Sequence, residues 1–429
     1  MLQAVACPAL VIVCLAASAA FGQEKNGLDT TRVRETHKVK KSFGATLADI
    51  PGEVLKLPVR TVRLLGLAAT SRPISHLTDL INFAAPARPY VPVVGYSHGA
   101  GVKFGFGLRK LTKRFWDDRL DFSWYYSSHD YQSYQFRYRV RETFVDWIGI
   151  DFHYRYKKRT REGFYGVGME TPEEYEANYT LESSEATLDL PFRTDKRFAF
   201  GVTSGFLLSN LSDGRDPDHP GTLDSLMADP RYALTPGRLD GSRWLRLGLI
   251  LEYDGRDNGG QPSRGFHVLS RWVRYLGTGR SEDMGYYEAK VDVQHYLDVW
   301  KKRILATRLF LQRFDADNSN QLATPINLIS RLGGAEGLRA FSSSRFIDND
   351  LVLASVEWRF PVWKILDGFI FVDGGRVYEK ITKAPVFRHW KGSYGVGFRV
   401  WNIQEVSFST TFAFGEEGTR VYVASGMAW

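Results

Sequence analysis

Apolar and polar side chains alternate with a period of two over most of the chain after about residue 95. In 134–141, apolar residues occupy every even position and polar residues every odd one, and the same alternation recurs at 148–157, 245–253 and 393–400. Successive side chains of a strand point to opposite faces, so this pattern predicts strands with one apolar and one polar face.

The length of these segments favours a membrane barrel over a soluble sandwich. Sandwich strands usually have about five to six residues, whereas many runs here last about ten and carry aromatic residues toward their ends, as in transmembrane barrels. Fifteen strands can be placed between 96 and 429. Because single-chain bacterial barrels have an even number of strands, we predict an all-β, 16-stranded antiparallel transmembrane β-barrel, with one strand missed or merged between 95 and 240. Two insertions, 210–241 and 315–350, are rich in Asp, Gly, Ser and Pro and are predicted to be loops.

The N-terminus carries the longest apolar run, residues 4–22, which ends in small side chains. This pattern predicts a signal peptide over 1–22, and the absence of Lys and Arg before the run leaves an uncleaved anchor as the alternative. Both cysteines, Cys7 and Cys14, lie in this run. The exported chain would therefore have neither a disulfide framework nor a cysteine metal site.

Residues 23–95 are predicted to form a periplasmic leader ahead of a barrel over 96–429. Within the leader, apolar residues of 44–83 recur at helical spacing, which predicts two or three short amphipathic helices. These helices could pack on the barrel, or they could form an interfacial helix or a plug in the lumen. The expected architecture is thus a barrel with a short helical N-terminal extension.

Composition and charge agree with an exported barrel. Aromatic residues make up 14% of the chain and glycine contributes 40 residues, while mean hydropathy is −0.27. This mixture is too aromatic for disorder and too polar for a helical membrane protein. The formal net charge is +8, but the basic residues alternate along strands instead of clustering on a helix. We therefore expect outer-membrane lipid and lipopolysaccharide as partners, and no nucleic acid.

The sequence carries no enzymatic signature. Its histidines are scattered, and neither a nucleophile motif nor a phosphate-binding glycine loop is present. We expect no catalytic residue, no cofactor and no metal, and a calcium-binding interpretation of the Asp- and Asn-rich turn near 254–258 is weak because no carboxylate closes the loop at the required distance.

The most specific motifs lie between residues 331 and 377. Residues 331–341 read RLGGAEGLRAF, 356–361 read VEWRFP and 369–375 read FIFVDGG. In this order and spacing they resemble the surface-antigen barrel of the BamA/TamA-type superfamily of outer-membrane proteins. The motif residues are Gly333, Gly334, Gly337, Arg339, Phe341, Glu357, Arg359, Pro361, Asp373, Gly374 and Gly375.

The resemblance implies that Arg339, followed by Phe341, forms the tip of a long extracellular loop that folds into the lumen and meets Glu357 and Asp373. Strand alternation independently places Glu357 in the lumen, where a carboxylate needs a partner and a planar guanidinium suits it. By residue type alone, Arg339 would be a solvated loop charge. Ala340 stands where the family usually has glycine, which puts the conformation of the tip in question.

Two further features resemble the same superfamily. One is an Asp-x-Arg-Asp turn between two strands, which from the residues alone predicts a salt-bridged turn. Its residues are Asp254, Arg256, Asp257, Pro262 and Gly265. The other is the terminal Trp429, which looks like the C-terminal signal by which outer-membrane barrels are themselves assembled.

The resemblance implies a role in inserting outer-membrane proteins or in translocating polypeptide or lipid across the outer membrane. In this superfamily the barrel opens sideways between its first and last strands, which are predicted here at 96–109 and 419–429. Partners would be nascent outer-membrane proteins or a periplasmic or outer-membrane subunit. Only about 70 residues precede the barrel, so a POTRA module is expected to be absent. This leaves a passive pore or a structural accessory subunit as the alternative function.

Overall fold

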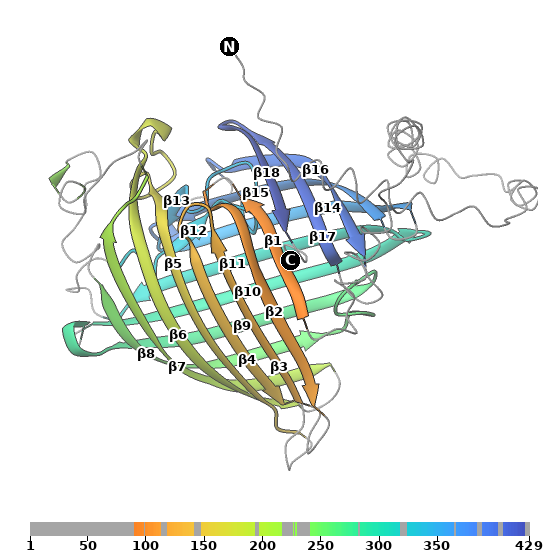
Figure 1. Ribbon diagram of the computed structural model, residues 1–429, viewed down its shortest axis with the longest axis horizontal. Coiled ribbons are helices and arrows are strands. Elements are labelled where there is room, and N and C mark those ends of the chain that lie inside the picture. Colours follow the sequence, from red (N-terminus) through yellow and green to blue (C-terminus); the bar gives the residue numbers. More distant parts are fainter. Residues whose placement is uncertain are drawn as a thin grey trace, which may run out of the picture.

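The computed structural model shows one β-barrel (Figure 1). The structure describes residues 90–97, 99–112, 118–140, 147–193, 197–216, 226, 228–229, 241–281, 284–317, 324–363, 366–383, 388–401 and 406–424. The predicted signal peptide, the predicted leader helices at 44–83 and the terminal Trp429 lie outside the described residues.

Sixteen of the described strands close into an antiparallel barrel, as predicted, and two more form a small hairpin inside the long loop after β11. The barrel strands are β1 (Tyr90–Ser97), β2 (Gly101–Thr112), β3 (Asp118–Ser127), β4 (Gln132–Val140), β5 (Ile150–Phe164), β6 (Ala177–Arg193), β7 (Phe198–Asp213), β8 (Ser242–Asp254), β9 (Gly265–Gly277), β10 (Gly285–Trp300), β11 (Arg303–Ala316), β14 (Asp350–Trp363), β15 (Leu366–Tyr378), β16 (Lys391–Trp401), β17 (Val406–Gly415) and β18 (Gly418–Ala424). The hairpin pairs β12 (Ser330–Leu332) with β13 (Phe346–Asp348).

The prediction misplaced the first strand. β1 covers Tyr90–Ser97, so the missing strand begins before the interval in which it was sought and overlaps only its first residues, and the barrel begins inside the predicted leader. The expected strand 96–109 joins the end of β1, a turn and most of β2. The sequence pattern did not reveal this strand because it contains Pro92. Proline has no backbone N–H to donate to a neighbouring strand, and it usually marks a strand end or an edge strand. The barrel therefore closes between β1 and β18, where Tyr96 is registered with Val423.

The alternation sorts side chains between the outer face and the lumen as predicted. On β8, Leu247, Leu249 and Leu251 are exposed on the outer face, whereas Arg246 is buried on the inner one. On β14, Val356 is exposed outside and Glu357 is fully buried inside. The outer face is thus apolar, and the charged side chains line the lumen.

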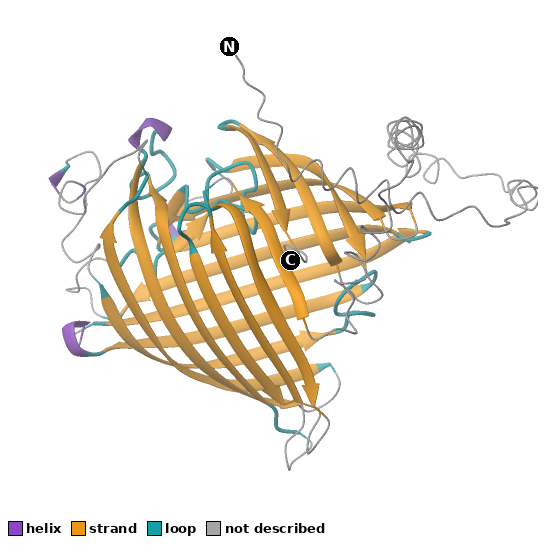
Figure 2. Cartoon of the chain, in the orientation of Figure 1, coloured by secondary structure: helices purple, strands orange, loops and turns teal. Residues whose placement is uncertain are grey.

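The two rims differ in their connections. Two residues, 301–302, join β10 to β11 at the rim where β1 begins, whereas 317–349 join β11 to β14 at the other rim. Outer-membrane barrels have short periplasmic turns and longer extracellular loops, so the first rim is periplasmic. Three short 3₁₀-helices accompany the described extracellular connections: η1 (Glu173–Tyr175), η2 (Gly279–Ser281) and η3 (Ile381–Lys383) (Figure 2). No helix among the described residues is long and apolar enough to cross a membrane.

The described part of the long loop, 324–349, packs against two separate walls of the barrel. Its residues Leu338 and Phe341 share a buried cluster with Phe369 and Phe371 of β15. Farther along, Ile326, Ile329 and Ile347 share another buried cluster with Phe164 of β5 and with Tyr179 and Leu181 of β6. The loop is therefore held between the β14–β17 side and the β5–β6 side of the barrel.

Candidate functional site

The loop tip depends on two glycines whose backbone no other residue adopts readily. Gly333 and Gly334 have φ values of +128° and +80°, in the left-handed range that favours glycine. A Cβ on Gly333 would lie 2.1 Å from the carbonyl oxygen of Ser342. A hydrogen bond of 3.0 Å from Gly334 N to Phe341 O closes the turn. This turn places Arg339 between the loop and the barrel wall.

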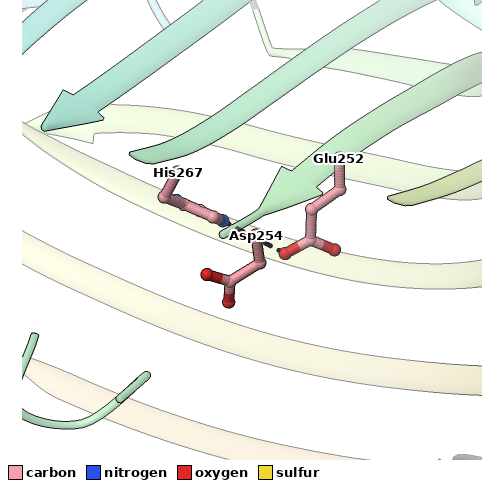
Figure 3. A group of neighbouring side chains, drawn as sticks. All are labelled: Glu252, Asp254 and His267. Atoms are coloured by element: carbon pink, nitrogen blue, oxygen red, sulfur yellow. Dashed lines mark hydrogen bonds and ion pairs between the residues drawn. The ribbon is translucent and has the colours of Figure 1, made fainter. Parts of the chain in front are cut away.

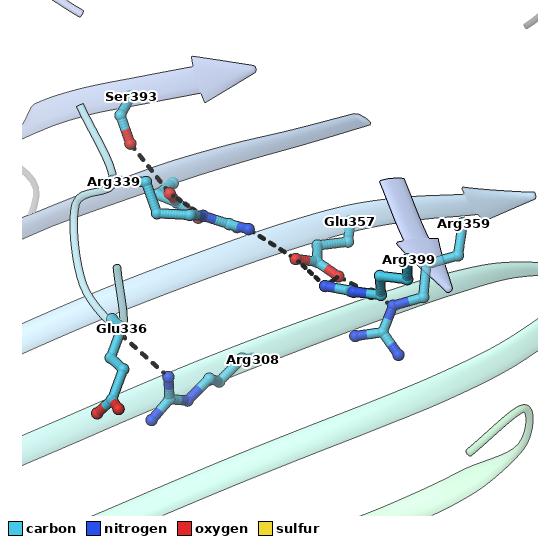
Figure 4. Close-up of polar contacts among 8 residues, drawn as sticks. Arg308, Glu336, Arg339, Glu357, Arg359, Ser393 and Arg399 are labelled. Atoms are coloured by element: carbon cyan, nitrogen blue, oxygen red, sulfur yellow. Dashed lines mark hydrogen bonds and ion pairs between the residues drawn. The ribbon is translucent and has the colours of Figure 1, made fainter. Parts of the chain in front are cut away.

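Arg339 contacts two carboxylates on neighbouring strands (Figure 4). Its Nε and Nη2 donate to Asp373 Oδ2 and Oδ1 at 2.8 and 2.7 Å, and its Nη1 donates to Glu357 Oε1 at 2.7 Å. The Arg339 Cζ atom also lies 3.5 Å from the centre of the Phe371 ring. The structure thus brings together the three charged residues that the resemblance implied, through the paired donors that only a guanidinium offers.

Glu357 is shared by three arginines (Figure 4). Besides Arg339, Arg359 Nε donates to Glu357 Oε2 at 2.9 Å, and Arg399 Nη2 donates to both carboxylate oxygens at 3.0 and 3.1 Å. On the next carboxylate, Ser393 Oγ donates to Asp373 Oδ2 at 3.0 Å. A single loop arginine therefore links β14, β15 and, through these partners, β16. Breaking such a buried pair typically costs about 3–5 kcal/mol, because the remaining charge loses its partner.

Ala340 fits the tip without strain in its backbone. It is fully buried and is not among the described residues with positive φ. Space for its methyl group comes from Gly415 at the end of β17, where a Cβ would lie 2.6 Å from the Ala340 Cβ. The next residue, Phe341, is also fully buried and packs on Phe346 with ring centres 5.2 Å apart. A glycine on the wall therefore compensates for the alanine in the loop.

A second ionic anchor holds the loop to the opposite wall. Arg331 Nη1 and Ser344 Oγ donate to Glu162 Oε1 at 2.9 and 2.7 Å. Glu162 belongs to β5, its side chain is 2% exposed, and it also accepts a hydrogen bond from Arg159 Nη1 at 2.9 Å. Both ends of the hairpin that carries the tip are thus fixed to β5.

The loop is also bonded to β18, the strand that closes the barrel. Arg420 Nε donates to Ala340 O at 3.1 Å, and the Tyr422 hydroxyl donates to Phe341 O at 3.4 Å. Just before this strand, Glu417 accepts a 2.7 Å hydrogen bond from Arg345 Nε. The tip therefore connects the β14–β16 wall to the closing strand.

The sequence reasoning missed several of these partners. Glu162, Ser393, Arg399, Arg420 and Tyr422 were not among the predicted site residues. The alternation of apolar and polar residues could have identified them as lumen residues, because all five occupy inward positions in their strands. Alternation indicates which residues face the lumen, but it does not show which of them meet the loop.

The remaining motif residues shape the wall around the loop. A Cβ on Gly375 would lie 2.8 Å from Val352 O and 3.3 Å from the Leu332 side chain of the loop, while one on Gly374 would lie 3.0 Å from the Trp390 ring. Gly337 N donates to Gly334 O at 3.1 Å inside the tip turn. Pro361 lies at a register irregularity near the end of β14. The two wall glycines therefore leave room for side chains that cover the strand.

The predicted turn motif lies at the periplasmic rim, between β8 and β9, away from the loop tip. Arg256 Nε and Nη2 donate to the two oxygens of Asp254 at 2.8 Å each. Asp257 accepts hydrogen bonds from the backbone N–H groups of 258, 263 and 264. Pro262 is buried, and Gly265 has a φ of +104°. The motif therefore forms a salt-bridged turn.

Three possible metal ligands meet beside this turn (Figure 3). One ligand atom from each of Glu252, Asp254 and His267 lies within 4.8 Å of the others. His267 Nε2 is already 3.1 Å from Glu252 Oε1, and both Asp254 oxygens accept from Arg256. A divalent cation could be held here only if those contacts were given up. The arrangement is that of a hydrogen-bonded cluster that fixes the strand ends.

A closed barrel with an apolar outer face, a charged lumen and an inward-folded loop defines a β-barrel membrane protein. Residues 118–417 match the Omp85 superfamily domain, and the chain belongs to this superfamily. The resemblance inferred from the motifs is thus confirmed at this level. The protein is an outer-membrane barrel whose outer face lies against lipid, and barrels of its superfamily serve transport and assembly instead of enzymatic catalysis.

Solved structures share this fold at low sequence identity. BamA from Haemophilus ducreyi lacking POTRA domains 1–3 is 16% identical, with a TM-score of 0.54 over 79% of this chain and 70% of that one. CdiB from Escherichia coli is 13% identical, with a TM-score of 0.50 over 80% of this chain and 63% of that one. The chain thus spans less than two thirds of that CdiB. No curated protein matches the chain in sequence.

Proposed function

We propose that this barrel assists the insertion of outer-membrane proteins, or the translocation of polypeptide or lipid, by opening between β1 and β18. The observation that carries the proposal is the loop tip, which is bonded at once to the β14–β16 wall through Arg339 and to β18 through Arg420. In this proposal Arg339, Phe341, Glu357 and Asp373 act as a lock that holds the closed state.

The physical basis of the activity is strand pairing. When β1 separates from β18, each presents a row of unpaired backbone N–H and C=O groups. An incoming strand can pair with such an edge, as in the β-augmentation seen in peptide recognition. Nascent outer-membrane proteins are therefore the proposed clients, and lipid and lipopolysaccharide surround the site of release. Similarity to BamA and CdiB supports the shared fold behind this proposal.

A passive pore or a structural accessory subunit is the competing function. A constantly open pore needs a lumen free of obstruction, whereas Leu338, Ala340 and Phe341 of the loop are fully buried against the wall. This packing favours a gated barrel. The two functions differ in one respect that can be tested, which is whether the β1–β18 junction must open.

A reversible disulfide across this junction tests the proposal. Tyr96 and Val423 are registered partners, so the Tyr96→Cys and Val423→Cys pair can bridge β1 and β18. The matched control is Val293→Cys with Leu309→Cys, which are registered across the continuous β10–β11 pair. In both versions Cys7 and Cys14 are replaced by serine.

The readout is the abundance of other folded barrels in the outer membrane of cells that depend on the variant. Under oxidising conditions the β1–β18 bridge should lower client abundance, a reductant should restore it, and the β10–β11 bridge should have no effect. Normal client levels with a fully formed β1–β18 bridge would contradict the opening. A protein whose depletion leaves all other barrels unchanged would be a passive pore or an accessory subunit instead.

A further inference from the structure

The periplasmic turn between β10 and β11 consists of two lysines in an unfavourable backbone conformation. Lys301 and Lys302 have φ values of +46° and +65°. A two-residue hairpin turn of this type needs positive φ at both positions, which Asn-Gly supplies with little strain. Long side chains are uncommon there. Strain retained at such a position indicates that the two side chains serve a purpose beyond the turn.

Lys301 of the turn and Arg303, the first residue of β11, hold their cationic groups against the same aromatic ring. The Lys301 Nζ atom lies 4.6 Å and the Arg303 Cζ atom 4.8 Å from the centre of the Trp300 ring. Distances below about 6 Å allow a cation–π attraction, which orders both basic side chains. The turn therefore presents an arranged basic cluster and not two independent surface charges.

A carboxylate and a further arginine lie beside this cluster. Asp298 is the nearby carboxylate, and it already accepts hydrogen bonds from Lys302 N at 3.1 Å and from Arg264 Nη2 at 3.3 Å. Arg264 comes from the adjacent β8–β9 turn, and its side chain is 70% exposed. Arg264 thus adds a fourth basic residue to this part of the rim, beside Lys301, Lys302 and Arg303.

The cluster lies at the level of lipid headgroups. Directly before it, Leu297 and Val299 are 47% and 50% exposed on the apolar outer face of β10. On the strands beside it, Tyr253 and Phe266 are exposed at the same rim, at the end of β8 and the start of β9. Aromatic side chains at strand ends mark the membrane–water interface. Basic side chains just beyond them meet the headgroups of the periplasmic leaflet.

We propose that Trp300, Lys301, Lys302 and Arg303 bind the phosphate of an anionic phospholipid in the periplasmic leaflet. The lysine ammonium groups supply charge-assisted hydrogen bonds to phosphate oxygens, and Arg303 adds positive charge beside them. The acyl chains of the same lipid lie along Leu297 and Val299. This site is separate from the loop lock and from the β1–β18 junction, so it does not depend on the proposed function.

The test uses the full-length barrel and the double variant Lys301→Asn, Lys302→Gly. Phosphatidylglycerol and zwitterionic phosphatidylcholine are titrated separately onto the purified protein, and bound lipid is counted by native mass spectrometry. The wild type should prefer phosphatidylglycerol, and the double variant should lose about tenfold of that preference, since each basic residue near an anionic surface contributes to binding. Because Asn-Gly suits the turn, the urea midpoint in zwitterionic lipid should stay equal or rise.

The matched control removes the same charge at the extracellular rim through Lys380→Asn and Lys383→Asn. Lys380 belongs to the connection after β15, and Lys383 ends the short helix η3. The control should retain the preference for phosphatidylglycerol. The site would be refuted if the turn variant kept the wild-type preference, or if the control lost as much as the turn variant did.

Discussion

Two walls of the same lumen carry arginine–carboxylate pairs in different surroundings. Between the loop and β14, the Arg339 and Glu357 side chains are 3% and 0% exposed. Between β4 and β5, Arg137 Nε and Nη2 donate to both oxygens of Asp151 at 2.8 and 2.5 Å, yet the Arg137 side chain is 43% exposed. The hydrogen-bond distances are similar. The two pairs therefore differ in burial, because the long loop covers the first, whereas the second lies near the periplasmic ends of β4 and β5.

This contrast shows that a charged lumen residue becomes an anchor only when something covers it. Removing one partner of a buried pair costs about 3–5 kcal/mol, whereas an exposed pair contributes about 0–1 kcal/mol. The β14–β16 wall and the loop tip should therefore govern the stability of the closed barrel. The β4–β5 pairs should chiefly set the polarity of the lumen.

The largest effect is expected for Glu357→Ala. This change leaves Arg339, Arg359 and Arg399 around an empty space, and we expect the free energy of unfolding to fall by about 3–5 kcal/mol. Urea unfolding of the refolded barrel, followed by tryptophan fluorescence, measures the change. A loss below 1 kcal/mol would mean that burial does not separate the two walls.

A smaller effect is expected for Arg420→Ala, which removes the hydrogen bond from β18 to the carbonyl of Ala340. Hydrogen bonds to charged groups contribute about 1.5–3 kcal/mol, so the barrel should lose stability in that range. Backbone amides of 418–424 should also exchange faster with deuterium, as measured by mass spectrometry. Unchanged exchange in this segment would show that the loop tip does not hold the closing strand.

A third effect tests the fit between Ala340 and Gly415. The change Gly415→Ala places a methyl group on the Ala340 Cβ, and overpacking of this kind costs about 1–3 kcal/mol. Adding Ala340→Gly should recover most of the loss, because it removes the methyl group that collides. If the second change gave no recovery in the same urea titration, the contact between these positions would not determine the tip conformation.

Much of the fold was predictable because alternation reports local geometry. The period of two identified the faces of the strands, and the even-number rule gave sixteen strands from fifteen visible ones. β1 escaped because Pro92 interrupts the pattern at the start of the barrel. The leader helices and the role of Trp429 remain predictions, since they lie outside the described residues.

The site was predictable only where residues lie close in sequence or follow an ordered motif. Arg339, Glu357 and Asp373 lie within 34 residues of one another and belong to motifs that could be compared. Arg331 and Glu162 are 169 residues apart and meet only because the closed barrel brings β5 to the loop. No local pattern reports such a contact, so the second anchor required the structure.

The smallest effect is expected for Arg137→Ala on the open wall. Its partner Asp151 keeps a 3.1 Å hydrogen bond from Arg139 Nε, and the Arg137 side chain already reaches solvent. The free energy of unfolding should therefore fall by only about 0–1 kcal/mol. This loss of stability relative to the wild type should be smaller still at about 1 M salt, where charges are screened within about 3 Å. Urea titrations at low and high salt measure both quantities. A loss as large as that of Glu357→Ala would mean that the β4–β5 wall is as strongly anchored as the covered one, and the contrast between the two walls would fail.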